Sequence, residues 1–304
     1  MNKLLVAPIT VEEFLQREIP PAKSLLGNWL EEGMPVLIAG EAGIGKSHFV
    51  YWLASAVAQG GEFLAWDAPE ALPVGLLDGE MRDSTITSRL ASIVASTGFD
   101  GKNLRLVSRD MFIHSRQLVP CLRSPEDCER VLDLFTGVKL LVVDNLNCFF
   151  AGGDENSSSF WDDVERFNLA CRDRGMTLLM VHHASKTNKG SPAGNSKNVR
   201  VPEVVIVLTA IEDASEGSAE FMVEFQKTRV QLTESKRFHV QLVQLEDGTA
   251  TWTLNATQRD ELTSRIRHMN EDGMSLRKIG EQTGMSHQTV SRILKKAPTQ
   301  QSIF

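Results

Sequence analysis

The clearest chemical signal in the sequence lies between positions 40 and 48, which read GEAGIGKSH. This stretch matches the spacing G-x-x-x-x-G-K-[ST], in which backbone N–H groups curl around a phosphate and the start of a helix adds a partial positive charge. An apolar strand over 36–39 enters the loop, and a helix with regularly spaced apolar residues leaves it. The residues expected to hold a nucleotide are Gly40, Glu41, Ala42, Gly43, Ile44, Gly45, Lys46, Ser47 and His48.

Two side chains of this loop have defined tasks in phosphoryl chemistry. The Lys46 ammonium should reach the β- and γ-phosphates, and the Ser47 hydroxyl should hold Mg²⁺. The pattern therefore predicts ATP and Mg²⁺ as cofactors, with Lys46 as a catalytic cation.

Carboxylates at two strand ends are the expected partners of the loop. Asp144 ends the apolar run LLVVD at 140–144. Because ligands of open α/β sheets gather at the carboxyl ends of the strands, Asp144 is predicted to bind Mg²⁺ together with Ser47. Asp78 and Glu80 follow the apolar run at 74–77, and a carboxylate there can orient the attacking water. Strands alternate faces, so one of this second pair is expected to be structural.

The elements that must position these residues read as an α/β fold with a mostly parallel central sheet. Short apolar runs separated by helical stretches are typical of buried parallel strands. They lie at 36–40, 73–79, 140–144, 177–183 and 204–208. After residue 219 the runs FMVEFQ, FHVQLVQL and TATWTLN alternate apolar and polar residues, which predicts antiparallel strands at one end of the sheet. Two short helices are expected in the N-terminal segment, at 11–17 and near 25–30.

Composition narrows the class of protein. Apolar residues make up 42% of the 304 residues and charged residues 23%, which is typical of a globular protein. No apolar run reaches the roughly 18 residues that a membrane-spanning helix needs, and no secretory signal is recognised, so we expect a cytoplasmic protein without a membrane partner. The four cysteines lack metal-ligand spacing, which favours reduced, structural thiols.

At this point the sequence resembles the RecA-like ATPases, and especially the RepA-type hexameric replicative helicases of plasmids. Four features occur in the same order: GEAGIGKS, then DGE at 78–80, then LLVVD, then MVHHASK at 180–186. The resemblance implies a RecA-like P-loop core and favours Glu80 over Asp78 as the catalytic carboxylate. It also implies that His183, or else His182, senses the γ-phosphate.

The same resemblance implies assembly. Lys227 and Arg229, in the motif Lys-x-Arg at the end of a strand, are similar to the pair that such rings insert into the ATP site of a neighbour. The expected partner is therefore a second copy of the chain, in a ring with a hexamer preferred; a solvated basic strand end is the alternative for this pair.

A long polar loop follows the histidines. Loops of such length inside a compact domain are usually functional or disordered. In RecA-like rings the equivalent loop faces the central channel. A basic loop can hold single-stranded DNA there by contacting its phosphates. The basic residues expected to do so are Lys186, Lys189, Lys197 and Arg200. A surface loop without a ligand is the alternative.

Residues 257–304 are similar to a helix-turn-helix domain. Ser275 and Ser286 suit helix N-caps, Gly284 suits the turn between two helices, and Gly280 lies where the helices would cross. From Thr257 onward the chain carries eight basic and five acidic residues, whereas the net charge of the whole chain is −7. The second helix would present to duplex DNA the side chains of His287, Gln288, Thr289, Arg292 and Lys295. A small helical docking module is the alternative.

These features divide the chain into an N-terminal lead-in segment (1–33), a RecA-like ATPase domain (34–256) and an all-α helix-turn-helix domain (257–304). Three functions are open at this point. The first is an oligomeric, DNA-associated motor or loader in the replication of a plasmid, phage or mobile element. The others are an ATP-gated transcriptional or copy-number regulator and a recombination or repair ATPase.

Overall fold

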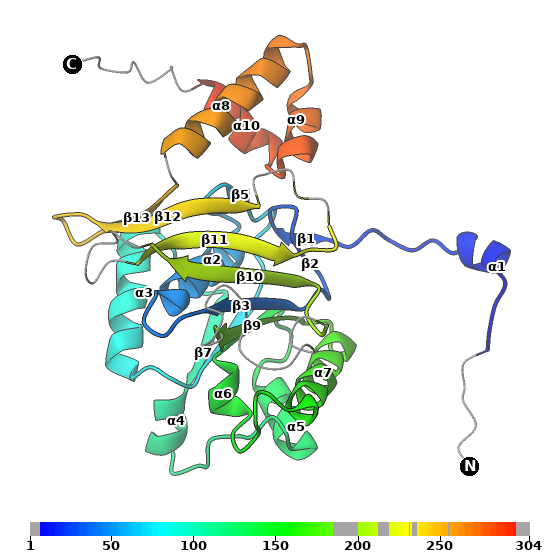
Figure 1. Ribbon diagram of the computed structural model, residues 1–304, viewed down its shortest axis with the longest axis vertical. Helices are drawn as coiled ribbons and strands as arrows, with labels where there is room; N and C mark the ends of the chain where they lie inside the picture. Colours follow the sequence, from blue (N-terminus) through cyan, green and yellow to red (C-terminus); the bar gives the residue numbers. More distant parts are fainter. Residues whose placement is uncertain are drawn as a thin grey trace.

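A central nine-stranded sheet organises the molecule (Figure 1). The computed structural model describes residues 7–184, 200–211, 219–230, 232, 236–254 and 256–295, with the backbone alone at 256–261 and 264. The strand order is β13-β12-β11-β10-β3-β9-β8-β6-β7. The sheet has its phosphate-loop strand near the middle, which is the place that an α/β fold gives to a ligand site.

Six neighbouring strands of the sheet are parallel. They are β7 (Leu104–Ser108), β6 (Val74–Asp78), β8 (Leu140–Asp144), β9 (Thr177–His183), β3 (Val36–Gly40) and β10 (Val204–Ala210). Three antiparallel strands extend it: β11 (Glu220–Lys227), β12 (Arg237–Gln244) and β13 (Ala250–Leu254). The α/β fold with a mostly parallel sheet is therefore confirmed, and the antiparallel strands lie at one end as predicted.

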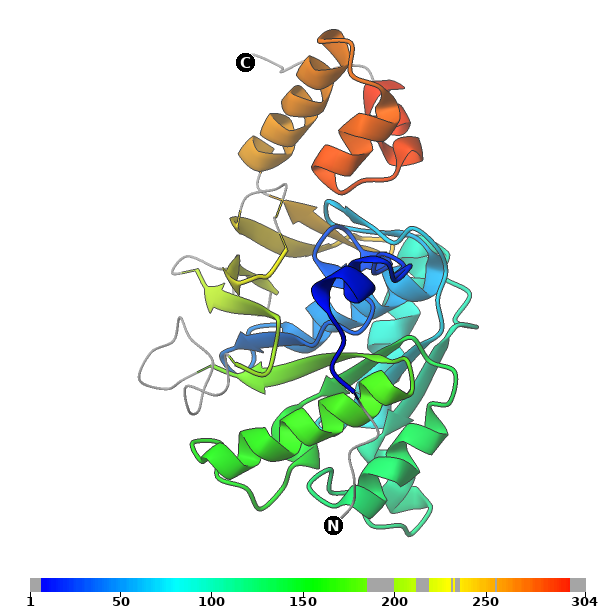
Figure 2. The same ribbon diagram turned by 90° about the vertical axis from the view of Figure 1, so that its right-hand side faces the viewer.

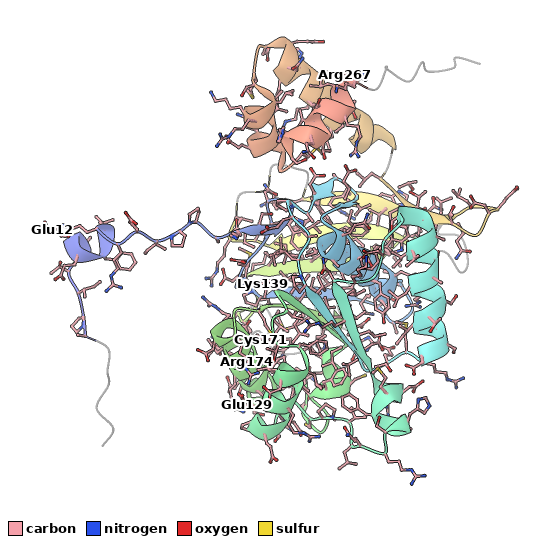
Figure 3. The ribbon with its side chains drawn as sticks, turned by 180° about the vertical axis from the view of Figure 1, so that it is seen from behind. Glu12, Glu129, Lys139, Cys171, Arg174 and Arg267 are labelled. Atoms are coloured by element: carbon pink, nitrogen blue, oxygen red, sulfur yellow. The ribbon has the colours of Figure 1, made fainter. Side chains whose placement is uncertain are left out.

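Helices cover both faces of the sheet (Figure 2). One face packs against α2 (Lys46–Gln59) and α3 (Asp83–Thr97). The other packs against α4 (Arg109–His114), α5 (Pro125–Leu134), α6 (Leu146–Phe149) and α7 (Ser158–Asp173). Arg174, just after α7, ties this second layer together, because its guanidinium contacts Glu129 and lies 2.7 Å from Asp133 of α5 (Figure 3).

The N-terminal segment differs from the expectation. A helix, α1 (Val11–Leu15), does form, and it stands away from the body (Figure 1). The second expected helix, near 25–30, is wrong: β1 (Ser24–Leu26) and β2 (Leu30–Glu31) form a hairpin instead. Gly27 has φ +57 in the turn, and Trp29 packs edge-on against Trp66 and Phe225. Burial of the aromatic rings therefore outweighs the helix-like spacing of apolar residues in this segment, and a hairpin forms.

A second small hairpin, formed by β4 (Glu62–Phe63) and β5 (Trp66–Asp67), follows α2 directly. Neither this hairpin nor β7 is among the strands predicted above. The β7 run is partly exposed and interrupted by Arg105, so it lacks the continuous apolar signal of its neighbours.

Three helices follow β13 and lie at the end of the molecule near β5 and β13 (Figure 1). They are α8 (Ala256–Glu271), α9 (Leu276–Thr283) and α10 (His287–Lys295), called the tail helices below. Their shared core contains Ile266, Ile279, Met285 and Val290. A Cβ at Gly280 would lie 2.5 Å from the Met285 carbonyl oxygen, so the close approach of α9 to the chain before α10 requires glycine.

Among the helices of the described ranges, none combines the length and the apolar character needed to cross a bilayer.

Candidate active site

The phosphate loop connects β3 to α2, as its spacing predicts. Gly45 caps α2 with φ +108, and a Cβ there would lie 2.7 Å from the Cβ of Ala219. Gly43 has φ +78 and no atom within 4 Å of a Cβ built on it. Both positions need left-handed backbone, and Gly45 also has no room for a side chain. The loop is thereby held open in front of the helix N-terminus, where backbone N–H groups can bind an anion.

Lys46 lies across this loop and is only 7% exposed. Its ammonium donates to the carbonyl oxygens of Gly40, at 3.0 Å, and Glu41, at 2.8 Å. Burial lowers the pKa of Lys46, while Asp144, Glu80 and Glu41 act in the opposite direction. Phosphate oxygens would offer the same ammonium an anionic partner in place of neutral carbonyls, as the predicted role requires.

Asp144 ends β8 in register with Asp78 of β6, and both carboxyls are buried. Burial and the neighbouring Asp78 raise the pKa of Asp144 to about 7, and the nearby Ser47 hydroxyl partly offsets this. Neither Asp144 carboxyl oxygen accepts a hydrogen bond with good geometry from the described part of the chain. A buried carboxylate without hydrogen-bond donors is costly unless a cation neutralises it. Together with Ser47 it therefore fits a Mg²⁺ that also binds phosphate oxygens.

Within the described residues, no three His, Cys, Asp or Glu side chains form a group that could hold a metal ion by themselves. The oxygens of Ser47 and Asp144 suit Mg²⁺, which keeps several waters and is commonly held by one or two protein groups plus phosphates.

The structure gives Asp78 and Glu80 different surroundings. Asp78 is fully buried and accepts three hydrogen bonds: from the Tyr51 hydroxyl at 2.7 Å, the Glu80 amide at 2.9 Å and the Met81 amide at 2.8 Å. These bonds fix the turn after β6. Glu80 is exposed at the end of this turn. The geometry therefore makes Asp78 the organiser of the turn and leaves Glu80 available to a water molecule.

Asn145 is a site residue that the sequence analysis does not identify. It is buried, its side-chain amide donates to the Glu80 carboxylate, and its side-chain oxygen accepts from the Cys148 amide at the start of α6. The available signal was its place directly after a strand-end aspartate. That signal is weak, because an asparagine there also reads as an ordinary helix cap.

The adjacent histidines point to opposite sides of β9. His182 is fully buried beside Phe160 and Trp161, with Nε2 3.8 Å from a Glu155 carboxylate oxygen. His183 is half-buried; burial and Lys46 lower its pKa, and Glu80 acts in the opposite direction. His183 pairs with Gly40, the first residue of the phosphate loop, so it lies at the strand end beside the site. A third histidine, His48, has its pKa lowered to about 4 by burial and Arg89.

The phosphate loop follows the carboxyl end of the parallel strand β3, whereas Lys227 and Arg229 lie at the opposite end of the strands, near the start of β10. Lys227 pairs with Val205 near the start of β10, whereas Gly40 pairs with Leu208 further along that strand. The Lys227 ammonium donates to the Pro202 carbonyl at 2.6 Å, and Arg229 is exposed, 3.9 Å from Glu203. The structure does not bring this pair together with the phosphate loop of its own chain.

The candidate DNA-binding residues fall into two groups. Lys186, Lys189 and Lys197 lie outside the described residues, and Arg200 is exposed in the turn before β10. On α10, the side chains of His287, Gln288 and Lys295 are exposed.

The other two candidates on α10 contact the β4–β5 hairpin of the ATPase domain. Thr289 donates to Asp67 at 2.9 Å, and Arg292 forms an ion pair with Glu62. The helix therefore rests partly on the β4–β5 hairpin.

Residues 3–189, more than half of the chain, match the family model described as AAA domain (AAA_25). Among solved structures, the chain is similar to the KaiC-like protein PH0186 from the hyperthermophilic archaeon Pyrococcus horikoshii OT3. The sequence identity is 18% and the TM-score 0.49, and the match covers 73% of this chain and 90% of that one.

Proposed function

The chain belongs to the AAA domain family, and from that premise we propose that it is a P-loop ATPase with a RecA-like core that works as an oligomeric, DNA-associated motor or loader in the replication of a plasmid, phage or mobile element. One observation carries the proposal furthest. The phosphate loop and its carboxylates lie at the carboxyl end of the parallel strands, and the Lys-x-Arg pair lies at the opposite end of the strands. An oligomer could bring the Lys-x-Arg pair of one subunit to the phosphate loop of its neighbour.

Within one subunit, each side chain has a task in hydrolysis. Lys46 would bind the β- and γ-phosphates, and Ser47 and Asp144 would hold Mg²⁺, which when bound would neutralise charge on the phosphates. Glu80 orients and deprotonates the attacking water, while Asp78 and Asn145 hold the turn that carries it. His183, at the end of β9, contacts the γ-phosphate and reports its presence to the loop that follows.

Assembly would let a neighbouring subunit supply a further cation to the phosphates. A head-to-tail contact repeats the same interface and generates a ring or a filament. Arg229 is the preferred in-trans residue, because a planar guanidinium can bridge two phosphate oxygens and because its side chain is 62% exposed. Lys227 lies beside it. A closed ring of six copies is the form that the resemblance favours.

DNA is the proposed second partner. The loop that contains Lys186, Lys189 and Lys197, together with Arg200, would track single-stranded DNA in the channel of a ring. The tail helices would bind duplex DNA as a helix-turn-helix, with α10 in the major groove.

An ATP-gated regulator that binds duplex DNA is the second candidate, and a specific observation favours it. α10 rests on the hairpin that directly follows the phosphate-binding helix α2, so α2 and this hairpin together connect the ATP site to the tail helices. A recombination or repair ATPase would use the same ATP site but form filaments.

Particle images of the full-length chain with an ATP analogue, with and without single-stranded DNA, test the proposal together with ATP turnover. We expect closed rings and hydrolysis stimulated by single-stranded DNA. Filaments would contradict the motor in favour of the recombination ATPase. Dimers that bind a specific duplex without displacing a strand would contradict it in favour of the regulator.

A further inference from the structure

Two carboxylates of the β4–β5 hairpin hold the beginning of α10. Asp67 accepts a hydrogen bond from the Ser286 amide at 2.6 Å and another from the Thr289 hydroxyl at 2.9 Å. Glu62 forms the ion pair with Arg292, and one of its carboxylate oxygens lies 3.3 Å from the Thr289 hydroxyl oxygen, whose single hydrogen goes to the nearer Asp67. We call Glu62 and Asp67 the acidic latch.

The contact is built into the packing of both partners. Asp67 is only 7% exposed, and its backbone carbonyl accepts from the Gly27 amide at 2.8 Å, so the backbone that carries the carboxylate is held in place. Ala65 of the same hairpin packs against the core of the tail helices. A Cβ on Gly284, in the turn before α10, would lie 3.3 Å from the Asn28 side chain. Carboxylate bonds, apolar packing and a close backbone approach therefore support one docked position.

The acidic latch holds two of the five side chains proposed to contact duplex DNA, Thr289 and Arg292, together with the Ser286 amide at the start of α10. The first turn of a recognition helix enters the major groove, and amide, hydroxyl and guanidinium donors there bind phosphates and base edges. The N-terminal end of a helix prefers an anion, which DNA would supply as phosphate and which Asp67 supplies as carboxylate. The latch and a duplex cannot both occupy the Ser286 amide and the Thr289 and Arg292 side chains.

We propose that Glu62 and Asp67 mask α10 from duplex DNA, so that duplex binding by the tail helices requires their release from the β4–β5 hairpin. This inference rests on the proposed duplex-binding function and adds its regulation. The chain has a closed form, with α10 on the hairpin, and an open form that binds DNA. The measured affinity for duplex is reduced by the fraction of molecules that are open.

Removal of the two charges with little change of shape tests the masking. In E62Q/D67N the amides are weaker acceptors than carboxylates, and Arg292 loses its ion pair, so the open form gains population. The probe is a duplex selected from a random-sequence pool by this variant, and binding of the full-length chain is followed by fluorescence anisotropy. We expect the variant to bind this duplex roughly tenfold more tightly than the wild type.

A matched variant controls for the loss of negative charge, which alone favours any contact with DNA. E70Q/E246Q also removes two acidic charges, at exposed positions outside the latch. We expect its affinity to stay within roughly twofold of the wild type. Single E62Q, at the more exposed latch position, should give part of the gain, so a folding defect of D67N leaves the test intact.

Hydrogen exchange reports the latch without DNA. The first turn of α10 should exchange faster in E62Q/D67N than in wild type, with α2 and the sheet unchanged. Equal duplex affinities of wild type and E62Q/D67N, or equal exchange of α10 in both, overturn the masking. If faster exchange is found but no duplex is selected from the pool, the duplex-binding function of the tail helices is wrong and the masking falls with it.

Discussion

The side-chain amide of Asn145 donates a hydrogen bond to the Glu80 carboxylate, which joins the turn after β6 to the end of β8. The Gly79 amide reinforces this junction by donating to the Asp144 carbonyl at 2.7 Å. A Cβ at Gly79 would lie 2.4 Å from Cys148, so the turn is pressed against α6. Glu80 is thus held by groups that belong to the same strand end as the proposed Mg²⁺ ligand.

Replacement of Glu80 by Gln should stop turnover while ATP still binds. The amide fills the same space but cannot accept the proton of the attacking water, and loss of a general base costs roughly 10²–10⁴-fold in rate. Steady-state hydrolysis and nucleotide binding by the same preparation check this. Asp78→Asn is the comparison: it should weaken the three bonds of the turn and lower the melting temperature. Turnover at the wild-type rate in Glu80→Gln would assign the base elsewhere.

Replacement of Asn145 by Asp should lower kcat about tenfold or more and leave KM for ATP nearly unchanged, because like charges then face each other at Glu80. The variant keeps the oxygen that caps α6, so the melting temperature should change little. Asn145→Ser, which can cap and also donate, should retain more activity than Asn145→Asp. Asn147→Asp makes the same charge change at an exposed neighbour and should leave kcat near wild type. Equal loss in the Asn145→Asp and Asn147→Asp variants would refute the positioning role.

The raised pKa of Asp144 gives a defined pH dependence of folding. Its pKa is about 7 in the folded chain and 3.8 in a model compound, so the folded state binds the proton more tightly. The contribution is fully present below pH 3.8 and is lost as pH rises through 7; it amounts to roughly a few kcal/mol. Without Mg²⁺, Asp144→Asn should therefore lose less stability than the wild type over this window.

Urea unfolding at a series of pH values checks the Asp144 prediction. In the wild type, Mg²⁺ with ATP should recover stability near neutral pH, because the cation favours the ionised carboxylate. The variant should show little such recovery. Parallel pH curves for wild type and Asp144→Asn would contradict the prediction.

Arg229→Ala should reduce ATP turnover by roughly 10³-fold or more while each subunit still binds ATP, because in-trans arginines are worth that much where they stabilise the transferring phosphate. Mixing is the sharper measurement. Lys46→Ala subunits keep the Arg229 side chain but lack a working site, and Arg229→Ala subunits have the reverse defect. Mixed oligomers should recover turnover. If subunit exchange is shown independently and no recovery is found, Arg229 does not act in trans.

Gly280→Ala should loosen the tail helices selectively. The added Cβ would meet the Met285 carbonyl at 2.5 Å, and overpacking of this kind costs roughly 1–3 kcal/mol. Hydrogen exchange should accelerate in α9 and α10, while basal ATP turnover stays near wild type. Gln282→Ala, at an exposed position of the same helix, serves as the control and should change neither.

The sequence predicts well wherever the signal is local and continuous. The five buried strands form where their apolar runs lie, because a strand buried on both faces is a continuous apolar run that is easily recognised in the sequence. The phosphate loop is equally local, since its glycines and its lysine lie within eight residues.

The sequence predicts poorly where distant residues decide. Leu25 to Leu30 carries a helix-like pattern, yet Trp29 is buried against Trp66 and Phe225, which are far along the chain. Asn145 is assigned to the site only through its contact with Glu80, 65 residues earlier. The contact between Asp67 and Ser286 spans 219 residues, and no periodicity of either segment indicates it.

Helix α2 has a consequence beyond its place in the core. Its first residue is Lys46, and its last, Gln59, is followed after two glycines by Glu62. The helix is a rod of about 21 Å that joins the ATP site to the hairpin under α10. Any factor by which bound nucleotide changes the duplex affinity must reappear, unchanged, as the factor by which duplex changes the nucleotide affinity. A titration of ATP in the presence and absence of DNA would thus measure the coupling between the ATP site at one end of α2 and the duplex-binding helix near its other end.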